Sequence, residues 1–516
     1  MNKLQTYYEQ LQLPIKAVFV GTVMIALGTI VQNPFINEFL KLNTPFMSII
    51  ANIILFSGGL ILSYFPVIIF IKLLTQRINE INIVVSGVIA YGIFLLVLAL
   101  LGPSGLPQAA YSGLMSVKFA GVSYPLMSTG IAGLIATYFM VKYVYRRTNT
   151  FIRVTQVSFI DRDTLKLVNT IFGAIILGAI FASVWPMAIN SLYSIMDFIA
   201  SDVNNPMNLF AYGGLERLLS LFNLDSILHH EFWLGSYGGT WMNLAGQTFV
   251  GDVNIWTAQM SETLNTLGLG GSGRFTSTYY VINLFSIPGY LLALWSTITM
   301  KKSFKVNVLA LSFGIFVSIT SGILLPIELI MLVSAPVIYL FHLFMVSFTY
   351  ALLNAFGATV GFSYLGNLST ATPGTIFDLL GFMSNPSIFD KIVIIIMVGI
   401  LSFLVYFVFV RFYYHKMAID ILNVGTKNER VFEFVERLGG LENIGMISST
   451  PTRVHVALVD RDKLNVAGLH RQGVTRIIET RFGYSLSFGA ASYIIQAEIN
   501  EQLKKMQQEQ VEDSND

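Results

Sequence analysis

The sequence contains no cysteine and has few charged residues. Among its 516 residues there are 0 Cys, and Asp, Glu, Lys and Arg together make up 12%. The absence of cysteine excludes disulfides, thiolate metal ligands and cysteine nucleophiles. Soluble domains carry about 25% charged residues, so the composition excludes a soluble protein for the chain as a whole. The 31 basic and 29 acidic residues nearly balance, which argues against a nucleic-acid-binding surface.

Long apolar stretches dominate the sequence instead. Hydrophobic residues make up 54% of the chain, and a membrane-spanning helix needs about 20 mostly apolar residues. The pattern predicts an α-helical polytopic membrane protein with about nine to ten transmembrane helices. The stretches that could span lie near residues 17–32, 48–74, 83–101, 122–144, 166–196, 278–300, 305–323, 326–353 and 391–414.

The short loops between these stretches contain clusters of basic residues. Lys72 and Arg77 lie in one loop, Arg146 and Arg147 in another, and Lys416 follows the last stretch. Because basic residues are retained on the cytoplasmic side, these loops and the chain after residue 415 are predicted to face the cytoplasm. The expected location is therefore a cell membrane, in contact with membrane lipid.

Two regions interrupt the helical pattern. Residues 200–275 are polar, glycine-rich and free of lysine, and residues 354–390 are moderately apolar but broken by Gly and Pro. Long loops inside compact proteins are usually functional, and transporters build substrate sites from broken segments at membrane depth. We therefore expect re-entrant hairpins that handle a substrate, and ordinary extracellular loops are the alternative.

The composition changes towards the C-terminus. The segment VFEFVERLGGLENI predicts an amphipathic helix that stops at Gly439 and Gly440, and TRVHVALVD, TRIIET and YSLSF predict short strands. A closing helix is expected over ASYIIQAEINEQLKKMQ. The predicted organisation is a membrane domain at 1–415, a linker at 416–430, a small cytoplasmic α+β domain at 431–505 and a disordered tail at 506–516.

Several strings make the interpretation more specific. They are GGLERLL (213–219), HHEFW (229–233), GDVNIWTAQ (251–259) and SGILLPIELIMLVSAPVIYLFH (321–342). Together they resemble the membrane component IIC of the bacterial phosphotransferase system sugar permeases, in the glucose superfamily and nearest its maltose and α-glucoside branch. The string LGGLENIGMISSTPTRVHVALVDRDKLNVAGL (438–469) resembles the IIB domain that is fused to IIC in this family. The resemblance covers roughly residues 15–505.

The resemblance implies a two-part mechanism. In the family, IIC binds a sugar outside and carries it inward, and IIB donates a phosphoryl group from a cysteine to a sugar hydroxyl. It also implies a homodimer and a partner phosphocarrier IIA, or a IIB supplied in trans. No cofactor and no metal are expected.

Candidate sugar-binding residues follow from the resemblance. The family uses an arginine, a histidine and the first glutamate of a Gly-Ile-Thr-Glu-Pro-x-Glu motif. The matching positions hold Arg217, His229 or His230, and Leu325 in place of that glutamate. Glu328 remains, and a carboxylate in an apolar run suggests a functional site. The alternatives are a structural Glu328, a salt bridge from Arg217 to Glu216 or Asp225, and packing roles for the histidines.

Asp252, Trp256 and Gln259 could form a sugar-facing wall, because an aromatic face stacks on a pyranose. Packing in the protein core is the alternative for these residues.

The phosphorylation motif departs further from the family. The position of its cysteine holds Thr450, while Arg453 is retained, Ser448 replaces an aspartate and His455 replaces a later arginine. A threonine hydroxyl needs an adjacent general base to act as a nucleophile, and phosphothreonine is a poor phosphoryl donor to another alcohol. We therefore predict that this chain alone does not run the phosphorelay.

Three functions remain open at this point. The first is a glucose-, maltose- or α-glucoside-type sugar transporter that has lost or outsources phosphoryl transfer. The second is a membrane sugar sensor or regulator that signals through a degenerate IIB domain. The third, chemically the least favourable, is a working phosphotransferase that uses Thr450.

Overall fold

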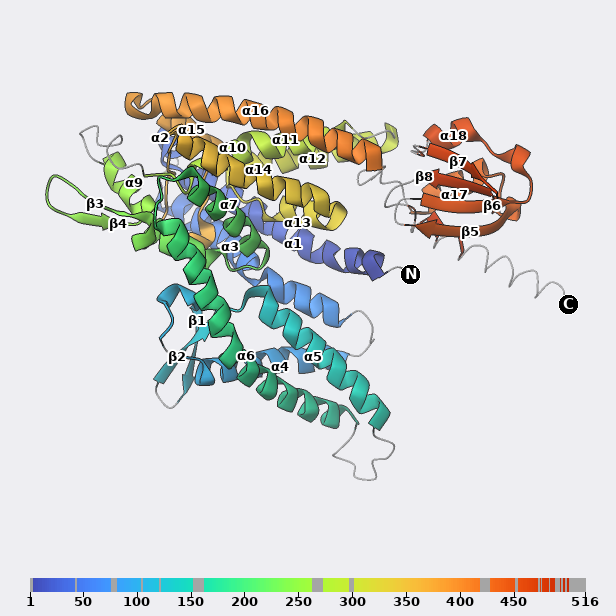
Figure 1. Cartoon of the computed structure of the whole chain (residues 1–516), viewed down its shortest axis with the longest axis horizontal. Helices are drawn as coiled ribbons and strands as arrows, with labels where there is room; N and C mark the ends of the chain where they lie inside the picture. The colour runs from blue at the N-terminus through green and yellow to red at the C-terminus, as the bar shows by residue number, and fades with distance from the viewer. Residues whose placement is uncertain are drawn as a thin grey trace.

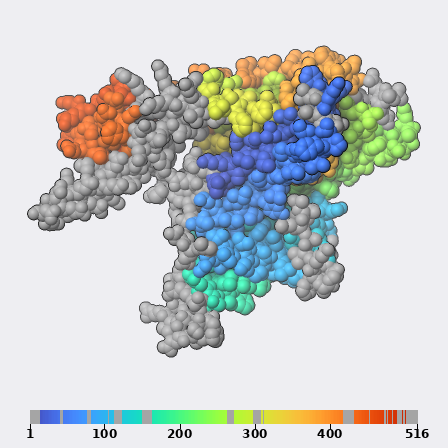
Figure 2. Space-filling model, turned by 180° about the vertical axis from the view of Figure 1, so that it is seen from behind, coloured from blue at the N-terminus to red at the C-terminus, as the bar shows by residue number. Residues whose placement is uncertain are grey.

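A computed structural model describes most of the chain. The described residues are 3–41, 44–75, 81–103, 105–119, 122–151, 162–261, 272–296, 301–417, 427–450, 453–471, 474, 476–481, 483–487, 492, 495–496 and 499–500. A helical body holds the first four-fifths of the chain, and a small sheet domain follows it (Figure 1). Seen from behind, the C-terminal residues form a lobe beside this body (Figure 2).

Six described helices are long and apolar enough to cross a membrane, so the structure is that of a membrane protein. They belong to α1 (Lys3–Gln32), α3 (Pro45–Leu74), α4 (Ile81–Leu101), α6 (Arg162–Ala200), α14 (Pro336–Ala355) and α16 (Pro386–Met417). Helix formation follows from composition, because an isolated strand in lipid would leave its backbone groups unpaired. The predicted stretches 17–32, 48–74, 83–101, 166–196 and 391–414 all lie within these helices.

Two other predicted stretches do not form one continuous helix. Residues 122–144 begin with strand β2 (Val122–Met127), which pairs with β1 (Tyr111–Phe119), and only then enter α5 (Gly130–Phe151). Residues 326–353 are divided between α13 (Leu325–Ser334) and α14, because Pro336 cannot continue the preceding hydrogen-bond ladder.

Two further predicted stretches differ in how continuous their helices are. The predicted stretch 278–300 contains α10 (Ser277–Val281), a π-helical turn (Ile282–Ser286) and α11 (Ile287–Trp295), and its last four positions, 297–300, lie outside the described residues. Of the predicted stretch 305–323, residues 305–321 lie in α12 (Lys301–Ser321), and the last two residues follow its end. Hydropathy detects these apolar segments but does not detect breaks within them.

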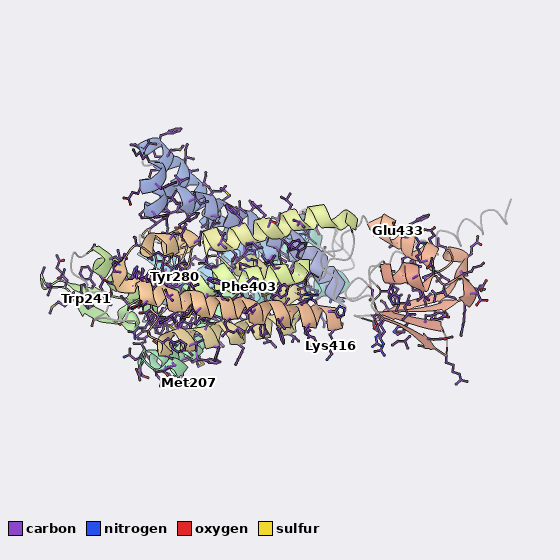
Figure 3. All side chains as sticks on the ribbon, turned by 90° about the horizontal axis from the view of Figure 1, so that it is seen from above. Met207, Trp241, Tyr280, Phe403, Lys416 and Glu433 are labelled. Carbon is purple, nitrogen blue, oxygen red and sulfur yellow. The ribbon has the colours of Figure 1, made fainter. Side chains whose placement is uncertain are left out.

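The polar region 200–275 contains several short elements. They are α7 (Pro206–Leu221), α8 (Asp225–His229), a π-helical turn (His230–Leu234), β3 (Thr240–Met242), β4 (Thr248–Val250) and α9 (Asp252–Ser261). Strands β3 and β4 form an antiparallel hairpin. In the view from above, Trp241 of this hairpin and Lys416 of α16 lie at opposite ends of the body, with the sheet domain beyond Lys416 (Figure 3).

Residues 354–390 follow α14 with little regular structure. They contain a 3-10 turn (Leu368–Thr370), the short helix α15 (Ile376–Phe382) and the start of α16. Asp378 of α15 accepts a hydrogen bond from Asn33, which caps α2 (Pro34–Leu40), so this region is tied to the N-terminal helices. The Asn33 Nδ2–Asp378 Oδ1 distance is 3.0 Å.

The C-terminal domain is a four-stranded antiparallel sheet in the order β5-β6-β8-β7. Its strands are β5 (Ile444–Thr450), β6 (Arg453–Leu458), β7 (Arg476–Thr480) and β8 (Gly483–Ser487), with α17 (Lys427–Arg437) and α18 (Val466–Arg471) beside them. The three predicted strands and the first predicted helix are confirmed; β5 was not predicted. Helix α17 ends before Gly439 and Gly440, whose φ angles of 95° and 97° favour glycine.

Apolar side chains of α17 and one face of the sheet form the core of this domain. The predicted closing helix lies largely outside the described residues, but its described positions 492, 495–496 and 499–500 are helical. Ile495 and Ile499 join the core. The predicted disordered tail and most of the predicted linker also lie outside the described residues.

Two phenylalanines of α17 allow a matched test of this packing. Phe434 is 1% exposed and Phe432 is 69% exposed. We expect Phe434→Ala to destabilise the sheet domain by about 3–5 kcal/mol because it leaves a cavity, and Phe432→Ala by less than about 0.5 kcal/mol. Hydrogen exchange of the full-length protein, read over residues 431–487, measures both. Equal protection in the two variants would contradict the assigned packing.

Candidate functional site

The centre of the helical body contains a buried network of ionisable side chains. Arg217 of α7 lies between two carboxylates: its Nη1 is 3.1 Å from Glu328 Oε1, and its Nη2 is 3.2 Å from Glu216 Oε2. Both carboxylates are fully buried, and Arg217 is 5% exposed. A buried guanidinium is tolerated where carboxylates neutralise it with good geometry. We call these three residues, with His229, His342 and the tyrosines bonded to them, the buried charge network.

Glu216 is surrounded by hydrogen-bond donors. His229 Nε2 lies 2.8 Å from its Oε1, the Tyr279 hydroxyl donates to the same oxygen at 2.6 Å, and the Tyr350 hydroxyl lies 2.9 Å from Oε2. Burial acts to raise the pKa of the Glu216 carboxyl, but Arg217 and His229 outweigh it and lower the pKa to about 2. Glu216 is therefore ionised.

The second carboxylate extends the network towards α14 and α16. His342 Nε2 lies 3.1 Å from Glu328 Oε1, and His342 Nδ1 lies 2.8 Å from the Tyr406 hydroxyl. His342 is fully buried, and Tyr406 is 1% exposed. Two atoms of this part of the network, Glu328 Oε2 and Arg217 Nε, are buried and have no hydrogen-bond partner. An unpartnered acceptor and an unpartnered donor on bonded residues can together bind a hydroxyl group.

Short or interrupted helices bring these side chains together. His229 is the last residue of α8, directly before the π-helical turn, and its ring stacks on Trp233 with centroids 3.9 Å apart. Glu328 lies in the first turn of α13, after Gly322, whose φ of 67° favours glycine. Helices α7 and α14 pack side by side (Figure 1), and Tyr339 of α14 donates to the Arg217 carbonyl at 3.0 Å.

The structure brings together three of the residues predicted from the sequence. Arg217, His229 and Glu328 belong to one network, and the alternative salt bridge from Arg217 to Glu216 is also present. His230 is not part of this network: its side chain is 41% exposed and its Nδ1 lies 4.0 Å from Glu231. Leu325 is partly buried at the start of α13, one turn before Glu328.

Asp252, Trp256 and Gln259 share one face of α9 and pack against other segments. Asp252 Oδ1 accepts from the Gly273 N–H at 2.9 Å, Gln259 Oε1 accepts from the Ser272 hydroxyl at 2.5 Å, and the Trp256 ring contacts Phe382 edge to face. These contacts fit the alternative of a packing role. Burial raises the pKa of the Asp252 carboxyl to about 7, although Arg274 and backbone N–H groups act to lower it.

Thr450 lies on the sheet of the C-terminal domain. The predicted loop from Ser448 to Arg453 is a hairpin: Thr450 is the last residue of β5 and pairs with Arg453, the first of β6. Ser448 pairs with His455, so His455 stands opposite Ser448 and not opposite Thr450. Paired residues and alternate residues point to one face, and this face carries Ser448, Thr450, Arg453 and His455.

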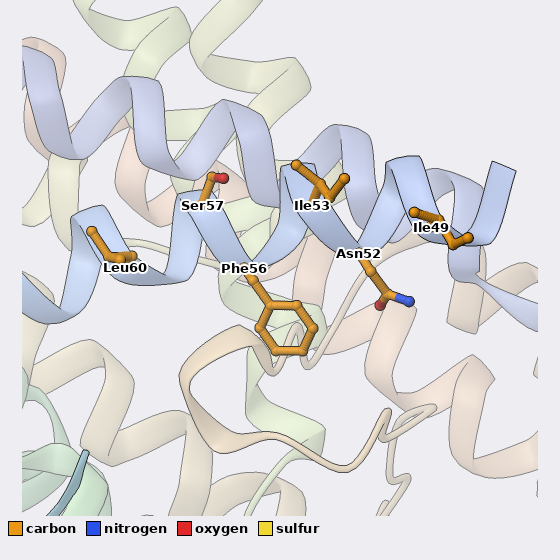
Figure 4. A pocket seen from close by; sticks show the side chains of 6 residues that line it. All are labelled: Ile49, Asn52, Ile53, Phe56, Ser57 and Leu60. Carbon is orange, nitrogen blue, oxygen red and sulfur yellow. The ribbon is translucent and has the colours of Figure 1, made fainter. Parts of the chain in front are cut away.

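A surface hollow of about 430 Å³ lies elsewhere, on α3. It is lined by Ile49, Asn52, Ile53, Phe56, Ser57 and Leu60 (Figure 4). Ile53 and Leu60 are 62% and 60% exposed, as expected of an apolar helix that faces lipid. None of the residues predicted from the sequence lines it. Among the described residues, no group of three or more His, Asp or Glu is placed to hold a metal ion.

The sequence interpretation missed Glu216, as a site residue, and His342 with Tyr406. An ionisable residue inside an apolar helix is itself a signal, and His342 could have been found in this way. The tyrosines could not, because tyrosine is common in this chain and its partners come from distant segments.

Comparison with protein-family models gives no independent assignment for these residues. No family model matches the chain. The roles considered below therefore rest on the geometry of the described residues and on the motifs of the sequence.

The central arginine provides a stability test of the network. We expect Arg217→Met to destabilise the protein by about 3–5 kcal/mol, because it leaves two buried carboxylates without their cation. Adding Glu328→Gln should recover part of this loss, because it removes one of those charges. Thermal unfolding of the purified full-length protein in detergent measures both. An unchanged midpoint for Arg217→Met, or no recovery in the double variant, would contradict the buried ion pairs.

Asp252 provides a test of pH dependence. Its pKa is raised from 3.8 to about 7 on folding, so the folded protein holds this proton more tightly than the unfolded chain. Asp252 therefore does not lower the stability of the folded protein below about pH 4, and it lowers that stability increasingly as the pH rises towards 7. Asp252→Asn should raise the free energy of unfolding more at pH 8 than at pH 5, and the two increases should differ by at most about 2–3 kcal/mol. The exposed Asp390→Asn is the control, and equal effects at both pH values would contradict the prediction.

Proposed function

We propose that this protein binds a sugar in the buried charge network and carries it across the bacterial cytoplasmic membrane without phosphorylating it. The observation that supports this proposal most strongly is that Arg217, His229 and Glu328 lie together in one network. These residues were selected from separate motifs of the sequence and lie in one network among helices long enough to cross a membrane. Charged groups buried among membrane-spanning helices mark substrate pathways in transporters.

The chemistry of the network fits a neutral polyhydroxyl ligand. Glu328 Oε2 can accept a hydrogen bond and Arg217 Nε can donate one, and both are buried without a partner. Trp233 stacks on His229, and the Tyr279 ring lies 5.1 Å from the Arg217 guanidinium carbon, so aromatic rings lie directly beside the polar groups. Sugars are bound by this combination of hydrogen bonds and aromatic faces. A glucose, maltose or α-glucoside type of sugar follows from the sequence resemblance alone.

The finer membrane arrangement also belongs to this proposal. Beyond the six described spans, α12 and the α10–α11 segment are candidate spans that would bring the number near the expected nine to ten. Regions 200–275 and 354–390 would then act as re-entrant segments. The hairpin β3–β4 and the sheet domain lie at opposite ends of the body (Figure 3), which fits a cytoplasmic C-terminal domain. A homodimer is proposed on the resemblance alone.

The residues at two positions, Thr450 and Leu325, are the reason for proposing that the protein does not transfer a phosphoryl group. Thr450 is exposed, and its hydroxyl lies 3.4 Å from the Arg453 carbonyl, which cannot remove a proton. His455 pairs with Ser448 instead. At the other position, Leu325 offers no carboxylate near the sugar. A phosphocarrier IIA or a IIB acting in trans would be needed for any phosphorylation.

A sensor is the second candidate, and the sheet of the C-terminal domain favours it. One face packs on α17, and the other carries Ser448, Thr450, Arg453 and His455. A polar face with an exposed arginine can bind a partner protein. The discriminating observation is sugar binding without flux, together with a partner captured on residues 430–505.

The proposal is tested by uptake in proteoliposomes that contain the purified full-length protein and no phosphocarriers. We expect labelled glucose or maltose to equilibrate across the membrane. Leu325→Glu should change the apparent affinity by tenfold or more, because it places a carboxylate one turn from Glu328, about 1.4 kcal/mol in binding. Leu325→Met is the matched control, since it conserves volume without adding an acceptor.

Three outcomes would count against the proposal. Transfer of labelled phosphate from the phosphocarriers to Thr450 and on to sugar would restore a phosphotransferase. Binding of sugar with no uptake would favour the sensor. If Leu325→Glu and Leu325→Met behave alike, the sugar is not bound near the start of α13.

A further inference from the structure

The buried charge network has more negative than positive groups. Glu216 and Glu328 oppose the single guanidinium of Arg217, and all three side chains are buried. If both histidines are neutral, the network carries one unbalanced negative charge. An isolated charge in an apolar interior is costly, and such sites bind a proton instead. The network therefore lacks one positive charge.

The hydrogen bonds identify where a proton can be accommodated. A carboxylate only accepts, so the His342 nitrogen that faces Glu328, Nε2, carries a hydrogen. The Nδ1 atom faces the Tyr406 hydroxyl at 2.8 Å. A hydroxyl can either donate or accept. Tyr406 can thus donate to a neutral His342 and accept from a protonated one, so protonation reverses the direction of this hydrogen bond.

His229 is less suited to hold this proton. Its Nε2 likewise donates to Glu216, but its Nδ1 lies 4.0 Å from Asp225 Oδ2, beyond hydrogen-bond distance. A proton on Glu328 Oε2 would have no acceptor, because that atom has no partner. Of the three positions, only His342 Nδ1 offers a bonded acceptor.

The ionisable groups that face His342 come from three helices besides its own. They are Glu328 of α13, Arg217 of α7, Tyr406 of α16 and, on α14 itself, Tyr339, with Glu216, His229 and Tyr279 farther along the network. The positive charge of Arg217 disfavours a protonated His342, but Glu328 lies between Arg217 and His342 and contacts both.

We infer that the buried charge network is a proton-binding site, with one proton held on His342 between Glu328 and Tyr406. The proton is taken from water when it binds and returns to water when it leaves the network. The inference rests on the proposed function for one consequence: a sugar that engages Glu328 or Arg217 changes the balance of charge and hence the occupancy of this proton. Sugar binding and flux are then pH-dependent.

The test reads the His342 ring directly. The full-length protein is prepared in lipid nanodiscs with 15N-labelled histidine, and the His342 signals are assigned by comparison with His342→Gln. We expect both ring nitrogens to carry a hydrogen at pH 7. Nδ1 without a hydrogen throughout pH 6–8 would overturn the inference, whether or not the protein transports sugar.

A pair of tyrosine variants on α16 provides the control. Tyr406→Phe removes the acceptor for the Nδ1 hydrogen, and we expect the Nδ1 signal at pH 7 to become that of a nitrogen without a hydrogen. Tyr414→Phe removes a hydroxyl that is also buried on α16 but bonds to Tyr290 and Ser334, and should leave the His342 ring signals unchanged. The same change of the Nδ1 signal in both variants would overturn the specific role of Tyr406.

Addition of glucose or maltose to the unbuffered protein completes the experiment. A protonated His342 with a pH change on sugar addition supports the inference and the proposed function together. A protonated His342 with no sugar bound supports the inference and counts against the proposed function. Sugar binding with a neutral His342 counts against the inference alone.

Discussion

The guanidinium of Arg217 must be neutralised inside an apolar body, and much of the central structure depends on this requirement. Its two carboxylate partners come from adjacent and distant positions: Glu216 precedes it in α7, and Glu328 is 111 residues away in α13. A buried arginine with one partner missing would be strongly destabilising. Helices α7, α13 and α14 are therefore held in one relative arrangement, and the tyrosines that donate to Glu216 extend the constraint to α10.

The interruptions of the helices follow from the same requirement. A continuous helix from 325 to 355 would fix Glu328 and His342 at 14 residues' separation along one axis, about 21 Å apart. The break between Ser334 and Pro336 lets the chain turn, so the two side chains meet at 3.1 Å. The π-helical turn after His229 similarly changes the register, and π-helical turns are frequent at functional sites.

The sequence predicts the membrane class, five of the long helices and most strands of the terminal domain, because these depend on local composition and periodicity. It also selects Arg217, His229 and Glu328 through motifs. It does not predict that Glu328 pairs with His342, since that contact depends on a chain reversal at Pro336. Only the start of the predicted stretch 122–144 is mispredicted: residues 122–127 form β2, whereas 130–144 lie in α5. Apolar strands and apolar helices have similar hydropathy, and only pairing with β1 distinguishes them.

Buried ion pairs seldom stabilise a fold better than apolar residues of the same volume would. A network of two carboxylates, a guanidinium and two imidazoles in this body therefore points to a role beyond folding. In the proposed function that role is binding, which needs neither a glutamate at Leu325 nor a cysteine at Thr450. Binding needs groups that accept and donate hydrogen bonds, which the network supplies, whereas phosphoryl transfer in the family that the sequence resembles uses a cysteine thiolate. A chain without cysteine can therefore perform the first without the second.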